Sequence, residues 1–468
     1  MPSAKKKNSV LFKYFLEIIP LEMNKMNNQE LYEFASKYLP GGVCSSARVN
    51  KSLGKPFYIS RVEGSKVFDL DGNEYIDLCT SFGSALIGHG HPKVIEAVKN
   101  SLDLGIMCAY ENEMQSTLAK RLAETIPCID MVRFTLSGTE TTYYAIKLAR
   151  EYTKRKYVVK FEGHFHGFND YLAYNYWPSK EDMWPKITPA QKGLPDYLQQ
   201  GFIVLPFNDF ELVEKTLTKR GHEIAAVILE PVNYNSGTIL PQEGFLEHLR
   251  KLTNEQGIVL IFDEILSSYK TGPGCMQEKF GITPDLCCIG KAIGGGLPLS
   301  LFGGKQEIMS HVSPLGDAQH SGTYNAPVIL MAAGNAFLDV IEEKGFYEKL
   351  LSRSDRLCSG MNEIMNRLGF IGRVQYFGAR FSLLFGPPAV RTVINNYGDM
   401  VDNDWDLLLA FYKACLKHGI HIHTMQHHGI SSAHTDEDVD QLLERIEESL
   451  REVMSTGLKT EKTQAAFF

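Results

Sequence analysis

Between residues 131 and 305 the sequence alternates short apolar segments rich in Val, Ile and Phe with segments of helical periodicity. This alternation is typical of parallel β-strands that are joined by crossover helices. The apolar segments are continuous, so both faces of the sheet are expected to be covered. The predicted strands are Met131–Leu136, Tyr157–Phe161, Phe202–Pro206, Ala225–Leu229, Gly257–Phe262, Leu286–Ile289 and Leu299–Phe302.

Other regions of the chain carry weaker structural signals. The segment FDLDGNEYIDL at 68–78 predicts two short strands around an Asp-Gly turn. After about residue 335 helical patterns dominate, with a β-rich stretch near 370–386, so a small α+β domain is expected there. The segment 171–200 is rich in Tyr, Trp and Pro, and it predicts either an active-site lid or a packed surface excursion.

Charge and cysteine usage exclude several classes of protein. The net charge is −7 and the only obvious basic cluster is Lys5-Lys6-Lys7, so small-molecule partners are expected and no nucleic-acid surface. The nine cysteines are scattered and include no C-x-x-C pair, which argues against a disulfide framework and a zinc site. A cytoplasmic protein without a metal site fits this pattern best.

The apolar segment at residues 9–21 follows the basic cluster in the manner of a signal peptide. Lys13 and Glu17 interrupt it and no A-x-A cleavage site follows, so an N-terminal extension or a short amphipathic helix is favoured. No apolar run approaches the ~20 residues that a membrane-spanning helix requires, so no membrane association is expected.

Two charged residues follow predicted buried strands. In GIVLIFDEI, Asp263 comes directly after an apolar run, where an ionised carboxylate is costly without a cationic partner. In DLCCIGKAIGGG, Lys291 precedes three glycines that let the backbone pass close to a bulky group. Ligands of open α/β sheets bind beyond the carboxyl ends of the strands, so both side chains are expected at one ligand site.

This pair of residues has two interpretations. A buried lysine with a depressed pKa is the usual Schiff-base nucleophile, and an acidic residue suits the protonated nitrogen of a pyridine ring. One cofactor would therefore explain both residues. A structural salt bridge between Asp263 and Lys291 explains them equally well, and the pair alone does not decide between the two.

Two further segments supply candidate ligand contacts. RFTLSGTETTYYAIKLAREY runs from a strand through Ser137, Gly138 and Thr139 into a helix, and free N–H groups at a helix amino terminus bind phosphate. Taken alone, Ser137 is better explained as a helix N-cap. KFEGHFHG ends a strand with two histidines around Phe165, whose ring suits stacking on a planar ligand, although a core position explains such an aromatic better.

In this order the segments resemble the class III aminotransferases of pyridoxal-5′-phosphate (PLP) fold type I, and most closely the glutamate-1-semialdehyde 2,1-aminomutase branch. The resemblance covers about residues 30–445. It implies an α/β fold with a large domain around a mostly parallel seven-stranded sheet and a small α+β domain. The matching motifs are YLPGGVCSSAR, DLDGNEYIDL, GHGHPKV, RFTLSGTET, FEGHFHG, EPVNYNSG, FDEI, GITPDLCCIGKAIGGGLP and GTYNAP.

The resemblance gives each matching residue an expected role. It implies that Lys291 forms the Schiff base with PLP and moves the proton between the substrate α-carbon and C4′, while Asp263 pairs with the pyridinium nitrogen. It also implies a homodimer. The other implied cofactor contacts are Ser137, Gly138 and Thr139 at the phosphate, Phe165 and the adjacent His166 at the ring, Asn235 near the phenolic oxygen, Glu230 as its support, and Thr323 at the neighbouring subunit's phosphate.

The substrate side departs from the family pattern. The stacking position is usually tyrosine in this branch but is phenylalanine here, and the pocket aromatic, commonly tryptophan in the aminomutase, is Phe82. Ser45 and Arg48 match positions beside the substrate carboxylate, and arginine binds carboxylates in a bidentate geometry. A surface or structural role for Arg48 stays open. The usual nearby glutamate appears as Gln426 in an ungapped alignment to SSAHT, and the two histidines after it are expected to be loop residues.

The expected activity is that of a PLP-dependent aminotransferase, which moves an amino group from an amino donor to an aldehyde or ketone acceptor. The alternative is glutamate-1-semialdehyde 2,1-aminomutase, in which the amino group migrates within one molecule. A non-catalytic protein on this scaffold is less expected, because Lys291 and Asp263 are both retained. The expected domain organisation is an N-terminal extension (1–26), a first small-domain segment (27–78), a large PLP-binding domain (79–335), a second small-domain segment (336–456) and a tail (457–468).

Overall fold

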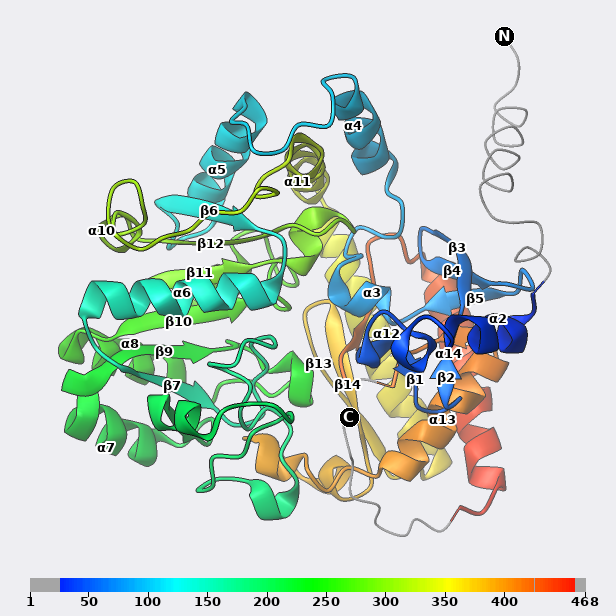
Figure 1. Ribbon diagram of the computed structural model, residues 1–468. Helices are drawn as coiled ribbons and strands as arrows, with labels where there is room; N and C mark the ends of the chain where they lie inside the picture. Colours follow the sequence, from blue (N-terminus) through cyan, green and yellow to red (C-terminus); the bar gives the residue numbers. More distant parts are fainter. Residues whose placement is uncertain (1–25, 425, 459–468) are drawn as a thin grey trace.

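The computed structural model describes residues 26–424 and 426–458. A seven-stranded sheet with the order β6-β12-β11-β10-β9-β7-β8 forms the centre of its larger part (Figure 1). All the strands predicted between residues 131 and 305 are present. Their bounds are β6 Met131–Thr135, β7 Tyr157–Phe161, β8 Phe202–Leu205, β9 Ile224–Leu229, β10 Val259–Glu264, β11 Leu286–Ile289 and β12 Ser300–Gly304.

The sheet is parallel from β8 to β11 and reverses at β12. The pairs β7–β8, β7–β9, β9–β10 and β10–β11 run parallel, whereas β12 runs antiparallel to both β11 and β6. The link before β12 holds only one 3₁₀ helix, η8 (Lys291–Gly294), and is shorter than the dozen or more residues that a crossover requires. The mostly parallel sheet is confirmed, but the regular alternation of strand and crossover helix is wrong at this link.

Helices cover both faces of the sheet, as the continuous apolar strands predicted. On one face, Ala145 and Leu148 of α6 share a core with Ala226 and Ile228 of β9. Buried residues of α7 and α8 share a core with the alternate residues of β9 on the other face, and α5 and α11 pack near β6 and β12 (Figure 1). The bounds are α4 Pro92–Leu102, α5 Glu113–Thr125, α6 Gly138–Thr153, α7 Phe210–Arg220, α8 Phe245–Gln256, α9 Cys275–Phe280, α10 Gln306–Met309 and α11 Val328–Ile341.

The smaller part of the molecule combines segments from both ends of the described chain. The hairpin predicted at 68–78 is confirmed as the antiparallel pair β4–β5, and β15 adds to β5 in parallel, with Ile420 opposite Ile76. The sheets are β15-β5-β4-β3, β13-β14-β16 and β1-β2. The bounds are α2 Asn28–Ala35, β1 Val49–Asn50, β2 Lys55–Pro56, β3 Ile59–Glu63, β4 Lys66–Asp69, β5 Glu74–Asp77, α3 Thr80–Gly83, α12 Phe346–Leu368, β13 Gly372–Phe377, β14 Arg380–Phe385, α13 Trp405–Lys417, β15 Ile420–His421, β16 His428–Gly429 and α14 Asp436–Ser455.

The first part of segment 171–200 is anchored in the interior rather than lying on the surface. Lys160 is fully buried on β7, and its Nζ donates hydrogen bonds to the carbonyl oxygens of His164, Leu172 and Tyr174. Burial lowers the pKa of Lys160 to about 7, against the opposing effect of nearby Glu230 and Glu162. The segment was expected to be either an active-site lid or a packed surface excursion. Packing describes the residues near Leu172 and Tyr174 better.

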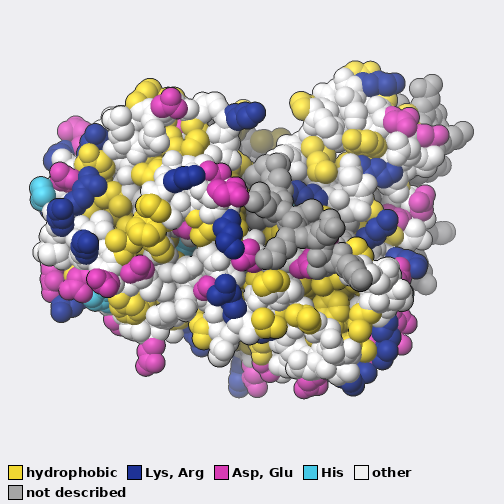
Figure 2. Space-filling view, turned by 90° about the horizontal axis from the view of Figure 1, so that it is seen from below, with side chains coloured by type: hydrophobic (Ala, Val, Ile, Leu, Met, Phe, Trp, Pro, Cys, Tyr) yellow, Lys and Arg dark blue, Asp and Glu magenta, His cyan; other side chains and the backbone are white. Residues whose placement is uncertain are grey.

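Charged side chains of both signs are interspersed over the described residues on the face seen in Figure 2. None of the helices in the described ranges has the length and apolar character needed to cross a bilayer. The predicted extension or amphipathic helix at 9–21 lies outside the described residues, as do nearly all of segment 1–26 and most of the tail at 457–468.

Candidate active site

A cavity of about 420 Å³ opens beyond the carboxyl ends of the parallel strands. Most residues that line it come from the ends of β6, β7, β9, β10 and β11 and from the segments that follow these strands, and Ser81 and Ser84 come from the turn at α3. The structure therefore brings together most of the cofactor contacts predicted from separate motifs. Those that line the cavity are Ser137, Gly138, Thr139, Phe165, His166, Glu230, Asn235, Asp263 and Lys291.

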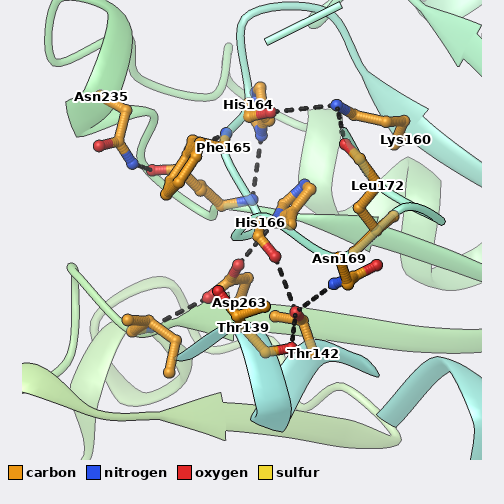
Figure 3. Close-up of polar contacts among 12 residues, drawn as sticks. Thr139, Thr142, Lys160, His164, Phe165, His166, Asn169, Leu172, Asn235 and Asp263 are labelled. Carbon is orange, nitrogen blue, oxygen red and sulfur yellow. Dashed lines mark hydrogen bonds and ion pairs between the residues drawn. The ribbon is translucent and has the colours of Figure 1, made fainter. Parts of the chain in front are cut away.

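Asp263 is buried without a cationic partner among the described residues. Its Oδ2 atom lies 2.7 Å from Nδ1 of His166, and its Oδ1 accepts a hydrogen bond from the backbone N–H of Ile265 (Figure 3). Burial lowers the pKa of His166, and the opposing interactions with Asp263 are smaller, so the imidazole is neutral at physiological pH. Within the described residues Asp263 forms no ion pair with a lysine or arginine side chain, and a protonated ring nitrogen in the cavity fits this carboxylate.

Lys291 is held in a strained backbone conformation at the start of η8. It is a non-glycine residue with φ of 46°, a left-handed value that costs free energy and is found mostly where structure or function requires it. Its amine makes no hydrogen bond or ion pair with any residue in the described ranges. The salt bridge to Asp263 that the sequence allowed is therefore not formed.

The environment of Lys291 favours its neutral, nucleophilic form. Burial lowers the pKa of its amine, Asp263 and Glu230 oppose this effect, and Arg380 adds to it. A neutral amine is the species that attacks an aldehyde carbon. The site therefore presents a free amine and an uncompensated carboxylate to the same cavity.

Glu230 links three parts of the cavity wall. Its Oε1 accepts a hydrogen bond from the backbone N–H of Phe165, and its Oε2 accepts one from Nδ2 of Asn235. Burial, with the nearby charge of Asp263, raises the pKa of Glu230 to about 8. The carboxyl group thus fixes Asn235 and the backbone of Phe165, which agrees with the supporting role that the resemblance implied.

The ring of Phe165 is fixed by aromatic neighbours from segment 171–200. It stacks on Trp177 with a centroid distance of 5.6 Å and an interplanar angle of 3°, and it meets Tyr176 edge-on at 5.3 Å. Phe165 also lines the cavity, so the ring is positioned to stack on a planar group inside it. The sequence analysis missed Trp177 as a support; the unusual Tyr and Trp content of 171–200 was the available signal.

The start of α6 forms the end of the cavity suited to an anion. Ser137 caps this helix, since its side chain accepts a hydrogen bond from the N–H of Glu140. A Cβ atom on Gly138 would lie 3.0 Å from Ile265, so the loop passes close to β10 and a side chain would not fit without adjustment. The helix amino terminus and its free N–H groups suit a phosphate. The N-cap interpretation of Ser137 holds, and it is compatible with the phosphate site.

The predicted substrate contacts lie apart from this cavity. Arg48 and Phe82 line a second, adjoining cavity, and Ser45 is exposed beside it. Gln426 is buried and lines neither cavity, although its side-chain amide makes no hydrogen bond within the described part of the chain. Thr323 is exposed beside a third hollow, away from the cavity of its own chain, and its contact with a neighbouring subunit stays a prediction.

A strained turn separates the first two cavities. Thr80, Ser81, Phe82 and Gly83 of α3 all have positive φ, at 48°, 49°, 55° and 90°. Each non-glycine residue in such a left-handed conformation costs about 1–2 kcal/mol, so the fold must stabilise the turn. Ser81 lines both cavities and Phe82 lines the second one.

Two buried groups hold this turn in place. Arg380 is 1% exposed, and its Nη1 donates a hydrogen bond of 2.6 Å to Oγ1 of Thr80. Its Nη2 hydrogen bonds to Nδ1 and the carbonyl oxygen of His427. Asp77 accepts hydrogen bonds from the backbone N–H groups of Cys79 and Thr80. No sequence motif marks Arg380, which lies in β14. His427 lies in a loop, as expected, although it is buried, whereas His428 lies in β16 and the loop expectation is wrong for it.

Residues 48–450 match the family model described as aminotransferase class-III. The chain belongs to the class-III aminotransferase family. Curated relatives of this aminotransferase include glutamate-1-semialdehyde 2,1-aminomutase 2 of Brevibacillus brevis, at 38% identity over 92% of this chain and 99% of the relative. The glutamate-1-semialdehyde 2,1-aminomutase of Thermoplasma volcanium is also 38% identical, over 92% of this chain and 100% of its own.

Solved structures show the same fold for this class-III aminotransferase. An omega-transaminase from Sphaerobacter thermophilus is 32% identical with a TM-score of 0.85, and the match covers 92% of this chain and 98% of that one. A beta-phenylalanine aminotransferase from Variovorax paradoxus is 27% identical with a TM-score of 0.81, over 99% and 100% of the two chains. The chain has the PLP fold type I, and its cofactor is pyridoxal 5′-phosphate, which a third relative, at 27% identity, is described as binding.

The buried carboxyl group of Glu230 predicts a specific pH dependence of stability. Its pKa of about 8 in the folded protein lies above that of an exposed glutamate, about 4.3, so folding is progressively destabilised as pH rises between these values. Glu230→Gln removes this dependence and leaves a constant offset from the altered hydrogen bonds. Denaturant titrations at each pH give the free energy of unfolding of both proteins. The value for the variant minus the value for wild type should therefore increase from pH 5 to pH 9. Parallel stability curves across this range would show that the group does not titrate there.

The turn at Thr80 predicts a local destabilisation. Thr80→Val keeps the β-branched shape but leaves Nη1 of the buried Arg380 without its acceptor, which should cost about 1–3 kcal/mol of unfolding free energy. Thr117→Val on the exposed face of α5 is the matched control and should change stability by less than about 0.5 kcal/mol. Equal effects of the two substitutions would mean that the Arg380 contact does not stabilise the turn.

Proposed function

We propose that this class-III aminotransferase moves amino groups between an amino donor and an aldehyde or ketone acceptor through Lys291. The observation that carries the proposal is the unpaired amine of Lys291, which lies in the same cavity as the buried carboxylate of Asp263. A non-catalytic role would leave this unpaired carboxylate and the strained backbone of Lys291 without a purpose.

The residues around the cavity would hold PLP by four kinds of contact. Lys291 would bind the aldehyde carbon, Asp263 would pair with the ring nitrogen, Phe165 would cover one ring face, and the amino terminus of α6 at Gly138 and Thr139 would bind the phosphate. When bound, PLP supplies a ring that withdraws electrons from the substrate carbon bearing the amino group. Asn235, fixed by Glu230, would lie near the phenolic oxygen.

The protein residues supply orientation and proton transfer. Asp263, oriented by the Nδ1–H group of His166, would keep the ring nitrogen protonated throughout the reaction. The amine of Lys291 would take the proton from the substrate α-carbon and deliver it to C4′, because its lowered pKa makes the neutral base available. The neutral His166 supports Asp263 without competing for its charge.

A second candidate is the intramolecular transfer of glutamate-1-semialdehyde 2,1-aminomutase. The names of the curated relatives, at 38% identity over nearly the whole chain, favour this activity over a transaminase with separate donor and acceptor. The substrate side favours the transaminase, because Phe82 lines the second cavity where the resemblance puts tryptophan. Gln426, which replaces the expected glutamate, lines neither cavity and does not bear on this choice. We give the transaminase as the proposal because the departures lie among the residues expected to choose the substrate.

Substitution of Lys291 tests the amino-transfer chemistry. Lys291→Ala should still bind PLP noncovalently through Asp263 and the start of α6, but it should lose borohydride-trappable cofactor and turnover by at least about 10³-fold. Absorbance after gel filtration and mass spectrometry of peptides reduced by borohydride measure the two effects. Trapped cofactor that persists in the variant would place the attachment on another residue.

A half-reaction screen distinguishes the two candidate activities. Purified PLP-loaded enzyme is mixed with single amines and amino acids in the absence of any acceptor, and the visible absorbance of the cofactor is followed. If the enzyme is a transaminase, the cofactor absorbance should bleach with one or more ordinary donors and should recover when a keto acid or aldehyde is added. Turnover with glutamate-1-semialdehyde alone, and with no other donor, would support the aminomutase instead.

A further inference from the structure

The second cavity has a volume of about 860 Å³ and shares the lining residues Ser81, Ser84 and Gly296 with the cofactor cavity. Most of its lining residues come from α3, from the N-terminal segment that contains α2, β1 and β2, and from strands β3, β4, β5 and β15. Ligand cavities of drug-sized molecules measure about 300–1,000 Å³. The space is therefore large enough for the body of a substrate whose amino group reaches Lys291.

The wall of this second cavity is mostly apolar and aromatic. Among its lining residues are Leu31, Phe34, Phe57, Tyr58 and Phe82. Its one lining carboxylate, Asp77, is already satisfied by His89 Nε2 and His421 Nδ1, each at 2.7 Å. No carboxylate in the described wall is thus left to bind a second ammonium group, and the lining favours an apolar or aromatic body.

His423 is a polar group of this wall whose ring nitrogens both lack partners within the described residues; Nδ2 of Asn50 is another unpaired group there. His423 lines the cavity, is 8% exposed, and packs edge-on against Phe82 with a centroid distance of 4.8 Å. Neither of its ring nitrogens makes a hydrogen bond within the described residues. Burial lowers the pKa of His423 to about 3, with a smaller contribution from His421, so the ring is a neutral donor and acceptor at physiological pH. A buried imidazole without a partner is costly, and a ligand hydroxyl would relieve that cost.

Arg48 is the one cationic side chain in the described wall of this cavity, and it suits an anionic group of a ligand. Its guanidinium is exposed, lines the cavity, and makes no ion pair with a described residue. A guanidinium binds a carboxylate with two parallel hydrogen bonds. The cavity thus combines a cationic group, an aromatic interior and a neutral hydrogen-bonding group in one space.

From this arrangement we propose that the second cavity binds the body of the substrate, and that this body is an aryl group with a hydroxyl substituent placed for His423 and a carboxylate placed for Arg48. The inference rests on the proposed amino transfer and names its substrate class, a hydroxyaryl amino acid or a close relative of one. His423 is the residue that selects the substituent. A short aliphatic substrate would leave both ring nitrogens of His423 unpaired.

Binding of ligands without an amino group tests this inference independently of turnover. Calorimetry on the PLP-loaded enzyme compares 3-(4-hydroxyphenyl)propanoate, 3-phenylpropanoate and butanoate. We expect the hydroxyphenyl compound to bind at least about 10-fold more tightly than butanoate. His423→Phe should weaken the binding of the hydroxyphenyl compound about 10-fold to 100-fold. It should change the affinity for the phenyl compound by less than about threefold, because only the hydroxyl loses a partner.

The controls separate this effect from a general loss of structure. His222→Phe changes an exposed histidine far from the cavity and should leave all three affinities unchanged. The visible absorbance of the bound cofactor should be the same in wild type and both variants. Equal weakening of the phenyl and hydroxyphenyl compounds by His423→Phe, or unchanged binding of both, would overturn the role of His423.

The donor screen distinguishes failure of this inference from failure of the proposed function. Tyrosine, phenylalanine and alanine are offered to the PLP-loaded enzyme under single-turnover conditions. Two results together would overturn the substrate class and leave amino transfer intact. Alanine would bleach the cofactor absorbance, and butanoate would bind as tightly as the aryl compounds. Absence of bleaching with any amine, including glutamate-1-semialdehyde, would overturn the proposed function itself.

Discussion

A buried carboxylate without a cation organises this active site. Asp263 lies at the carboxyl end of β10, and its hydrogen-bonding partners in the described part of the chain are a neutral imidazole and one backbone N–H. Removing a carboxylate from water without a counter-charge is expensive, so the folded protein holds a position that a cationic ring nitrogen can stabilise. His166, Glu230, Asn235 and the free amine of Lys291 are arranged around that position, and their roles follow from it.

Strain in the backbone is concentrated around the same cavity. Lys291 and the turn Thr80–Gly83 both adopt left-handed conformations that unconstrained chains avoid. The surrounding fold stabilises the turn through Asp77 and through Arg380, a buried guanidinium whose hydrogen-bonding partners among the described residues are the neutral groups of Thr80 and His427. The strained turn lies at both cavities, since Ser81 lines each of them and Phe82 lines the second.

The cofactor side and the substrate side of this class-III aminotransferase have changed to different degrees. On the cofactor side, the residues expected from the resemblance surround one cavity with compatible geometry. On the substrate side, Phe82 lines the second cavity where the resemblance puts tryptophan, and His423 lines the same cavity.

The sequence by itself determined the order of strands and helices and the positions of Asp263 and Lys291, because hydrophobic periodicity is local and parallel strands end at one edge of a sheet. Only the tertiary structure decided which side chains complete the site. His166 reaches Asp263 across 97 residues and Arg380 reaches Thr80 across 300. The tertiary structure also places Gln426 outside both cavities and shows that β12 runs antiparallel to its neighbours. Such contacts depend on how distant segments pack, and no local pattern of residues encodes them.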